Sequence, residues 1–138
     1  MNKSDQIIPV LAAIIYNEDN AILLAQRGPK QTHSGLWEFP GGKLRPGEDP
    51  CSCLRREIKE ELGLSIQVDE FFEASNYQYP GSNILLLAYR CTLSGGKLEP
   101  VEHQMVKWLL PEELTRYEVT AADLPIIHKL QRKLNGRV

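Results

Sequence analysis

The stretch that decides the fold runs from Gly42 to Leu64 and reads GKLRPGEDPCSCLRREIKEELGL. Asp49 followed by Pro50 is typical of a helix start, because an aspartate side chain caps free backbone N–H groups and proline suits the first helical position. Gly63 stands where a left-handed residue commonly ends a helix. The sequence therefore predicts a helix between Asp49 and Gly63, preceded by a loop.

Charged residues on this helix are sorted by sign around an apolar stripe. At about 100° per residue, the stripe contains Cys51, Leu54, Ile58 and Leu62, one flank carries Arg55, Arg56 and Lys59, and the other carries Glu57, Glu60 and Glu61. Like charges three or four residues apart repel. Three glutamates on one flank therefore suit a hard divalent cation such as Mg²⁺, which prefers oxygen ligands.

A solvated, glutamate-rich surface is the simpler interpretation of the helix taken alone. The turn Pro40-Gly41-Gly42 just before it changes the balance. Glycine lets the backbone approach a ligand at close range, where a side chain would obstruct. Together, the turn and the sorted charges favour a metal site.

Strands are predicted on both sides of the helix. Before it, apolar and β-branched residues predict a hairpin of strands 7–16 and 21–26, then a loop over 27–35 and a short extended piece over 36–39. After it, strands are predicted over 66–79, 83–93 and 105–110, then a short helix from Pro111 and a closing amphipathic helix over 121–134. Without a regular βαβ repeat, we expect a mixed sheet flanked by helices, in one domain over residues 1–138.

Composition bounds the class of protein. The 138 residues are 42% apolar and 25% charged with a formal charge of -2, which is typical of a globular protein and argues against a nucleic-acid polymer as partner. Apolar runs are far shorter than the roughly 20 residues of a membrane span, and no signal-peptide pattern precedes Ile7. We therefore expect a cytoplasmic protein with no membrane partner. Its cysteines should be reduced, and the scattered His33, His103 and His128 should lie in loops or on the surface.

Residues 42–64 resemble the signature of the Nudix hydrolase family, the Nudix box. A glycine, five residues, a glutamate, seven residues and the run Arg56 to Leu64 fill every defining position of that box. The flanks look like the MutT branch of the family, and within it like the CTP pyrophosphohydrolases. These flanks are Ala25-Gln26-Arg27, residues 35–43, Glu102-His103-Gln104, Trp108 and residues 121–125.

The resemblance implies an α/β (α+β) fold, the Nudix α/β/α sandwich around a mixed sheet. It implies hydrolysis of a nucleoside triphosphate to the monophosphate and pyrophosphate, with Mg²⁺ as cofactor and Mn²⁺ as an alternative. CTP, dCTP and oxidised or otherwise modified nucleotides are the implied substrates, which would serve sanitation of the nucleotide pool. We expect a monomer or homodimer acting on this small molecule.

Carried over position by position, the resemblance implies a catalytic set of Arg56, Glu57, Glu60 and Glu61 and metal ligands from Gly41 (its carbonyl), Glu57, Glu60, Glu61 and Glu102. Arg56 would orient the glutamates, and Glu48 would support the loop and helix. This agrees with the chemistry, since a metal must neutralise the phosphates and acidify a water before a carboxylate can take its proton. Glu57 is the favoured base, but the same carboxylate can hold the metal, and the sequence leaves these roles open.

The implied substrate-binding residues are Arg27, Phe39, Lys43 and Asp123. Arg27 would reach the phosphates, and Lys43 would add positive charge there. Phe39 alternates toward the pocket, but a large aromatic residue at this position can equally belong to the core. An ionised Asp123 only accepts hydrogen bonds, so it would suit the exocyclic amine of cytosine better than the O6 acceptor of guanine. The alternative is that Asp123 simply caps the closing helix near Pro125.

Three other activities stay open. A strict 8-oxo-dGTP diphosphatase, or a hydrolase of ADP-ribose or dinucleoside polyphosphates, would keep the chemistry and change the substrate. A non-catalytic nucleotide sensor would keep only the fold. The intact glutamates of the box argue against the sensor, and the short chain argues modestly against the larger substrates.

Overall fold

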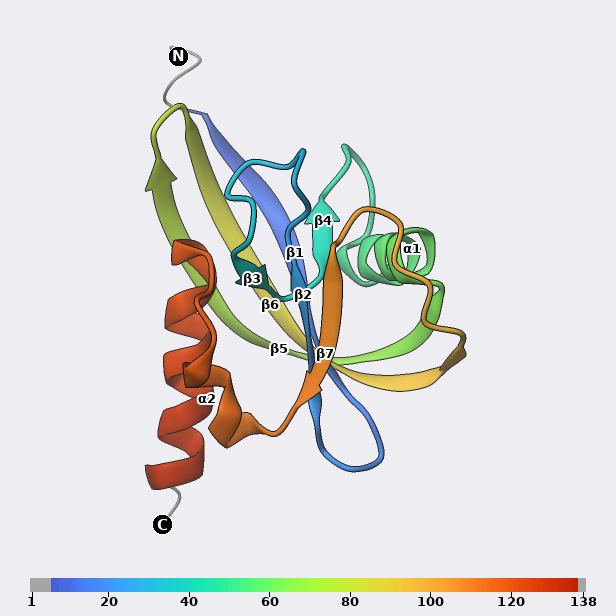
Figure 1. Ribbon diagram of the computed structural model, residues 1–138. Coiled ribbons are helices and arrows are strands. Elements are labelled where there is room, and N and C mark those ends of the chain that lie inside the picture. The colour runs from blue at the N-terminus through green and yellow to red at the C-terminus, as the bar shows by residue number, and fades with distance from the viewer. Residues whose placement is uncertain (1–5, 137–138) are drawn as a thin grey trace.

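A mixed β-sheet lies between two α-helices in the computed structural model, which describes residues 6–136 (Figure 1). The strands are β1 (Ile7–Tyr16), β2 (Ile22–Gln26), β3 (Trp37–Glu38), β4 (Gly41–Lys43), β5 (Leu64–Tyr79), β6 (Ser82–Gly96) and β7 (Met105–Leu109). The helices are α1 (Pro50–Leu62) and α2 (Leu124–Gly136), with 3₁₀ helices η2 (Pro111–Arg116) and η3 (Ala121–Asp123). This confirms the predicted α/β/α sandwich.

The sheet mixes parallel and antiparallel pairs. Its main order is β3-β2-β1-β6-β5, with β4 paired to β1 and β7 paired to β2. The central pair β1 and β6 is parallel, whereas β5 and β6 are antiparallel over almost their whole length. Among residues 6–136, no helix has the length and apolar character needed to cross a membrane.

Helix α1 begins and ends where its sequence predicts. The Asp49 carboxylate accepts the Ser52 N–H at 3.0 Å, and Pro50 occupies the first turn. Gly63 ends the helix with φ 75°, a left-handed conformation that glycine adopts without strain. The two caps satisfy backbone groups that would otherwise lack partners, and so they fix both ends of the helix. The helix in turn carries Glu57, Glu60 and Glu61.

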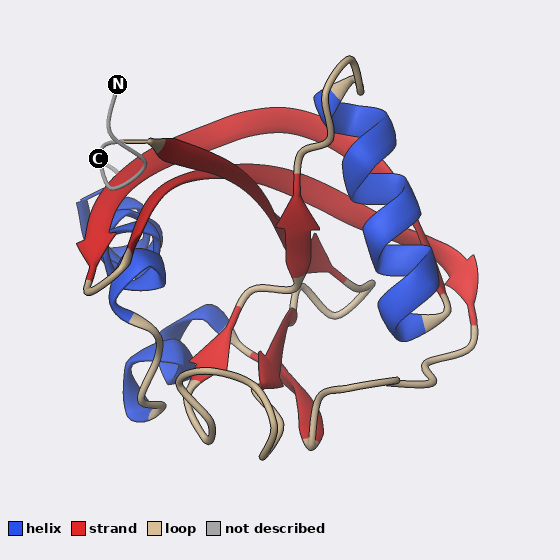
Figure 2. Cartoon of the chain, turned by 90° about the horizontal axis from the view of Figure 1, so that it is seen from above, coloured by secondary structure: helices blue, strands red, loops and turns tan. Residues whose placement is uncertain are grey.

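Alternating side chains of the inner strands build a separate core on each face of the sheet. On β1, Leu11, Ala13 and Ile15 face α1, whereas Ala12 and Ile14 face α2. All five are essentially inaccessible to solvent. This alternation follows from the period of two along a strand. Figure 2 shows the two helices on opposite sides of the curved strands.

The predicted hairpin of residues 7–16 and 21–26 is wrong beyond its turn. The turn itself forms, with an Asn17 N–H to Ala21 O bond of 3.0 Å, but the only register pair between β1 and β2 in the described chain is Tyr16 with Ile22. β4 occupies the edge of β1 farther along, and β6 occupies the other edge. β2 therefore leaves β1 and pairs with β3 and β7.

The predicted Pro40-Gly41-Gly42 turn is also replaced, since Gly41–Lys43 form the short strand β4. Gly41 lies directly against the Leu11 carbonyl of β1, where a Cβ would collide with the backbone. A side chain is therefore excluded by close packing of two strands. The neighbouring Gly42 leaves room for the Glu57 side chain, because a Cβ at residue 42 would collide with the Glu57 carboxylate.

The closing helix is split at its start. The predicted span 121–134 is the 3₁₀ helix η3 followed by α2, which packs Ile126, Ile127 and Leu130 into the core. η3 contributes Ala122 to the same core. The end of η3, at Asp123, lies beside a cavity.

Candidate active site

Arg56 is the hub of the charged face of α1. Its guanidinium contacts Glu48 at 2.8 and 2.9 Å, Glu57 at 2.9 Å and Glu60 at 3.2 Å. Hydrogen bonds from Arg56 hold the pKa of Glu48 low, at about 2. The predicted separation of charges by sign is thus wrong for Arg56, whose long side chain reaches across to the glutamate flank. Part of the expected repulsion is compensated within the protein.

Glu57 and Glu61 form the crowded part of this face. Glu57 is 15% exposed and abuts Gly42 of β4. Burial raises the pKa of Glu61 to about 8, and the charge of Glu57 adds to the effect, with smaller contributions from Glu38 and Glu102. Carboxylates from α1, β3 and the segment before β7 therefore act on one group, which is the electrostatic setting that a bound cation would relieve.

The carboxylate oxygens of this face are the ligand type that a hard cation prefers, but the side chains do not form a complete coordination shell. Among residues 6–136, no three acidic, histidine or cysteine side chains are arranged to hold a metal ion by themselves. Glu60 is 55% exposed beside Arg56, apart from Glu61 and Glu102. A divalent ion with partial protein ligation and phosphate oxygens in its remaining positions fits such an arrangement, as is usual for Mg²⁺.

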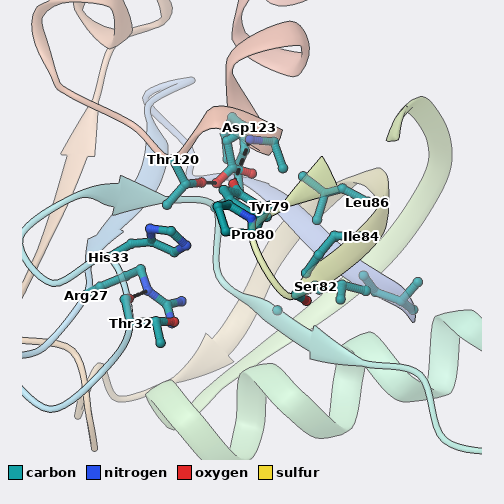
Figure 3. A pocket seen from close by; sticks show the side chains of 15 residues that line it. Arg27, Thr32, His33, Tyr79, Pro80, Ser82, Ile84, Leu86, Thr120 and Asp123 are labelled. Atoms are coloured by element: carbon teal, nitrogen blue, oxygen red, sulfur yellow. Dashed lines mark hydrogen bonds between the residues drawn. The ribbon is translucent and has the colours of Figure 1, made fainter. Parts of the chain in front are cut away.

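A cavity of about 400 Å³ opens beside these carboxylates. Figure 3 shows one wall built from the loop after β2, with Arg27, Thr32 and His33, facing Tyr79 and Pro80 at the end of β5. Its lining is mainly apolar, and its volume lies in the range of small-molecule pockets. Tyr79 and His33 stand with ring centroids 4.7 Å apart. Sequence patterns gave no sign of either residue in the pocket.

The predicted substrate-binding residues divide between cavity and surface. Arg27, Phe39 and Asp123 line the cavity, as does Gly41. Phe39 is 4% exposed and belongs to the α2-side core as well. Lys43 is exposed and lies outside the cavity lining. The structure therefore brings three of the four predicted substrate-binding residues to the cavity, whereas Lys43 is exposed at the end of β4.

Arg27 is held firmly in the cavity wall. Its Nη1 pairs with the Glu38 carboxylate at 2.8 Å, and its Nε and Nη2 donate to the Thr32 carbonyl and hydroxyl. The guanidinium thus has a defined orientation before any ligand binds. Sequence reasoning missed Glu38, whose position on a two-residue strand between buried aromatic residues carries no pattern of a functional residue.

Asp123 is buried in the cavity wall, 3% exposed. Its Oδ2 accepts the Thr120 hydroxyl at 2.5 Å (Figure 3). Burial raises its pKa to about 8, and the nearby charge of Glu38 adds to this. Asp123 thus lies at the cavity, as the sequence predicts. The prediction assumed an ionised carboxylate, whereas burial in this structure favours the neutral form.

His103 lies in a loop, as expected. Its side chain is nevertheless only 3% exposed, and its Nε2 lies 3.1 Å from the Glu38 carboxylate. His33 is exposed, as expected, yet it also lines the cavity. The thiols of Cys51, Cys53 and Cys91 are free, which agrees with the predicted reduced state.

Comparison with known proteins places these features in a family. The NUDIX domain family model matches residues 7–130. The CTP pyrophosphohydrolase of Escherichia coli (strain K12) is 40% identical over 122 residues, covering 88% of this chain and 90% of that protein. The 8-oxo-dGTP diphosphatase of the same organism is 31% identical over 125 residues, covering 91% of this chain and 97% of that protein.

Solved structures agree with the sequence matches. The solution structure of the E. coli ORF135 protein superposes with a TM-score of 0.84 at 37% identity, covering 99% of this chain and 97% of that chain. The crystal structure of the MutT protein from Methanosarcina mazei Go1 superposes with a TM-score of 0.85 at 22% identity, covering 95% and 96%. The second likeness concerns the fold alone.

Proposed function

This chain belongs to the Nudix hydrolase family and is a pyrophosphohydrolase, and we propose that it converts nucleoside triphosphates to the monophosphate and pyrophosphate. The preferred substrates are CTP and dCTP, together with oxidised or otherwise modified nucleotides. The CTP pyrophosphohydrolase and 8-oxo-dGTP diphosphatase relatives support this substrate class.

The junction of cavity and carboxylates at β4 carries the proposal. Gly41 lines the cavity, and the next residue, Gly42, abuts the Glu57 carboxylate. Consecutive Cα atoms lie about 3.8 Å apart, so a base in the cavity leaves its phosphates within reach of α1. A nucleotide with several phosphates would fill both parts of the site, with its base in the cavity and its phosphates beside the carboxylates of α1. A ligand that occupied only one part would not explain why the two parts adjoin.

The proposed metal ligands are the Gly41 carbonyl and the carboxylates of Glu57, Glu60, Glu61 and Glu102. Crowding of Glu57 and Glu61, and the reach of Glu102 to Glu61, support this set. Glu60 would have to turn away from Arg56 to take part. What Mg²⁺, or Mn²⁺, supplies when bound is neutralisation of phosphate charge and a more acidic water.

The chain's own side chains position the reaction. Glu57 accepts the proton of the attacking water, and Arg56 holds that carboxylate through its 2.9 Å contact. The water oxygen forms a new bond to one of the two phosphorus atoms of the α–β anhydride, and the P–O bond between that atom and the bridging oxygen breaks. The group that keeps the bridging oxygen leaves with the electron pair of that bond, so the products are the monophosphate and pyrophosphate in either case. Arg27 lies in the cavity wall toward the phosphates, and Lys43 adds positive charge at the rim.

Base selection follows from the protonation of Asp123. A protonated carboxyl group donates through its O–H and accepts through its carbonyl oxygen, whereas the ionised form only accepts. Near neutral pH, Asp123 can therefore pair with the amine of cytosine and also with a carbonyl of an oxidised guanine. This favours 8-oxo-dGTP hydrolysis as a second activity of the same site.

A substrate panel tests the function. The protein is incubated with Mg²⁺ and, separately, CTP, dCTP, 8-oxo-dGTP, ADP-ribose or diadenosine tetraphosphate, and the products are separated by anion exchange. Pyrophosphate and CMP from CTP are expected. Cleavage of ADP-ribose or diadenosine tetraphosphate alone would overturn the substrate class, and nucleotide binding without any product would make the protein a sensor.

A further inference from the structure

His103 is a buried polar side chain that the proposed reaction does not use. It lies beside Glu102 in residues 99–104, a segment we call the strap, which belongs to the connection between β6 and β7 and passes the end of α1. Its Nε2 lies 3.1 Å from Glu38 Oε2. Its Nδ1 is buried without a hydrogen-bond partner. A buried polar group of this kind calls for a physical explanation.

The protonation of the ring follows from its partners. A carboxylate accepts hydrogen bonds, so the 3.1 Å contact with Glu38 is satisfied when His103 Nε2 carries the hydrogen. A second hydrogen on Nδ1 would be a buried donor without an acceptor, which is unfavourable. The tautomer with hydrogen on Nε2 alone therefore satisfies the ring best.

Glu38 divides its carboxylate between two parts of the site. Oε2 accepts from His103 in the strap, and Oε1 accepts from Arg27 in the cavity wall at 2.8 Å. The charge of Glu38 also acts on both Glu61 and Asp123. This side chain therefore stands between the carboxylate cluster and the cavity.

The strap itself is held by backbone contacts on two sides. Its first half donates to the end of α1, from Glu99 N–H to Leu62 O at 2.8 Å and from Val101 N–H to Glu61 O at 3.0 Å. Its last residue, Gln104, donates to Gln26 O of β2 at 3.0 Å. Between these points, the Glu102 carbonyl packs so closely on Gly28 that a Cβ would collide with it.

We propose that His103 is a positioning residue, which ties the Glu102 strap to the cavity wall through Glu38 and keeps the metal side and the nucleotide side at a fixed spacing. The inference rests on the proposed function, which assigns Glu102 to the metal and Arg27 to the phosphates. Fixed spacing matters because misplacement by about 1 Å can lower a rate about 100-fold.

Two substitutions separate the hydrogen bond from packing. His103→Leu keeps the bulk and removes the donor, whereas His103→Gln keeps an N–H near the Nε2 position. We expect His103→Leu to lower kcat for CTP and the affinity of the free protein for Mn²⁺ by about 10- to 100-fold, as is typical when a group behind metal ligands is lost. His103→Gln should recover most of both losses. His128→Leu, on the exposed face of α2, is the matched control and should change neither.

Three measurements decide the proposal: steady-state kinetics, Mn²⁺ titration by electron paramagnetic resonance, and imidazole ¹⁵N NMR of the tautomer. Glu38→Gln should lose at least as much as His103→Leu, because it also weakens the pair with Arg27, and the double variant should lose less than the sum, because the two residues share one contact. If His103→Leu does not fold, Glu38→Gln alone still tests the contact.

Wild-type kcat and Mn²⁺ affinity in His103→Leu would overturn the proposal, as would equal losses in the Leu and Gln variants or an Nδ1–H tautomer. If wild-type protein cleaves no nucleoside triphosphate, the proposed function fails instead. The Mn²⁺ and NMR measurements would still test the role of His103 in that case.

Discussion

On the α1 face, Arg56 contacts the carboxylates of Glu48, Glu57 and Glu60, whereas on the cavity side Asp123 is buried with the Thr120 hydroxyl beside it. The first arrangement keeps the Glu48 carboxylate ionised, as its low pKa indicates. The second favours the neutral form. In this one protein, hydrogen bonds from a cation hold one carboxylate in its charged form, whereas burial favours the neutral form of another. This division suits the two tasks that we propose for these groups, cation binding and hydrogen-bond recognition of the base.

Glu61 stands between these two cases. It lies on the same helix as Arg56, yet burial and neighbouring carboxylates raise its pKa to about 8. Its charge is thus uncompensated by the protein itself. We interpret this as the point where an external cation completes the charge balance of the site.

The largest effect should come from neutralising the carboxylate cluster. Glu57→Gln or Glu61→Gln should lower pyrophosphate release from CTP by several orders of magnitude, because each removes a charged metal ligand or the base. In metal-free buffer, the same variants should keep or raise the melting temperature, since repulsion is relieved. Kinetics and calorimetry check both results, with Glu18→Gln in an exposed turn as control. Near-normal turnover by both variants would remove the cluster from the mechanism.

An intermediate effect is expected from Asp123→Asn, which fixes one donor and one acceptor at every pH. At pH 9, where wild-type Asp123 is mostly ionised, the variant should shift kcat/KM from CTP toward 8-oxo-dGTP by about 5- to 150-fold. At pH 6, the wild-type carboxyl group is neutral, and the shift should be much smaller. A shift that is the same at both pH values would mean that the protonation of Asp123 does not select the base.

The smallest effect concerns stability. Because the folded pKa of Asp123 is raised from 3.8 to about 8, the folded state binds this proton more tightly than the unfolded state. Its stabilising contribution is complete below about pH 4 and is lost as the pH rises through about 8. Asp123→Asn should therefore match wild type near pH 4 and melt about 3 °C or more above it at pH 9. The same difference in melting temperature between the two proteins at both pH values would contradict a buried, protonated Asp123.

Prediction from sequence succeeded where the information was local. Helix α1 starts at Asp49–Pro50 and ends at Gly63 because cap residues act within one turn of the chain. The apolar stripe of α1 is buried through Cys53, Leu54, Ile58 and Leu62, a set that differs from the predicted one only in its first member. Most strand bounds were also predicted to within a few residues.

Prediction failed where a partner lies far away in the chain. The alternation of β1 indicates two buried faces but does not say that β6 pairs with it in parallel and that β4 takes its other edge. Nothing in the sequence around His103 indicates that its ring reaches Glu38. The two residues meet only because the strap packs against the end of β2, where Gln104 N–H donates to Gln26 O.

The chemistry of this protein can be inferred from 23 consecutive residues, Gly42 to Leu64, because they place Glu57, Glu60 and Glu61 on one helix that is capped by its own neighbours in sequence. The environment of these groups and of Asp123 depends on the tertiary structure. Burial and neighbouring charge set a pKa, and both depend on which elements pack together. The cavity likewise exists only where the loop after β2, the end of β5 and η3 meet.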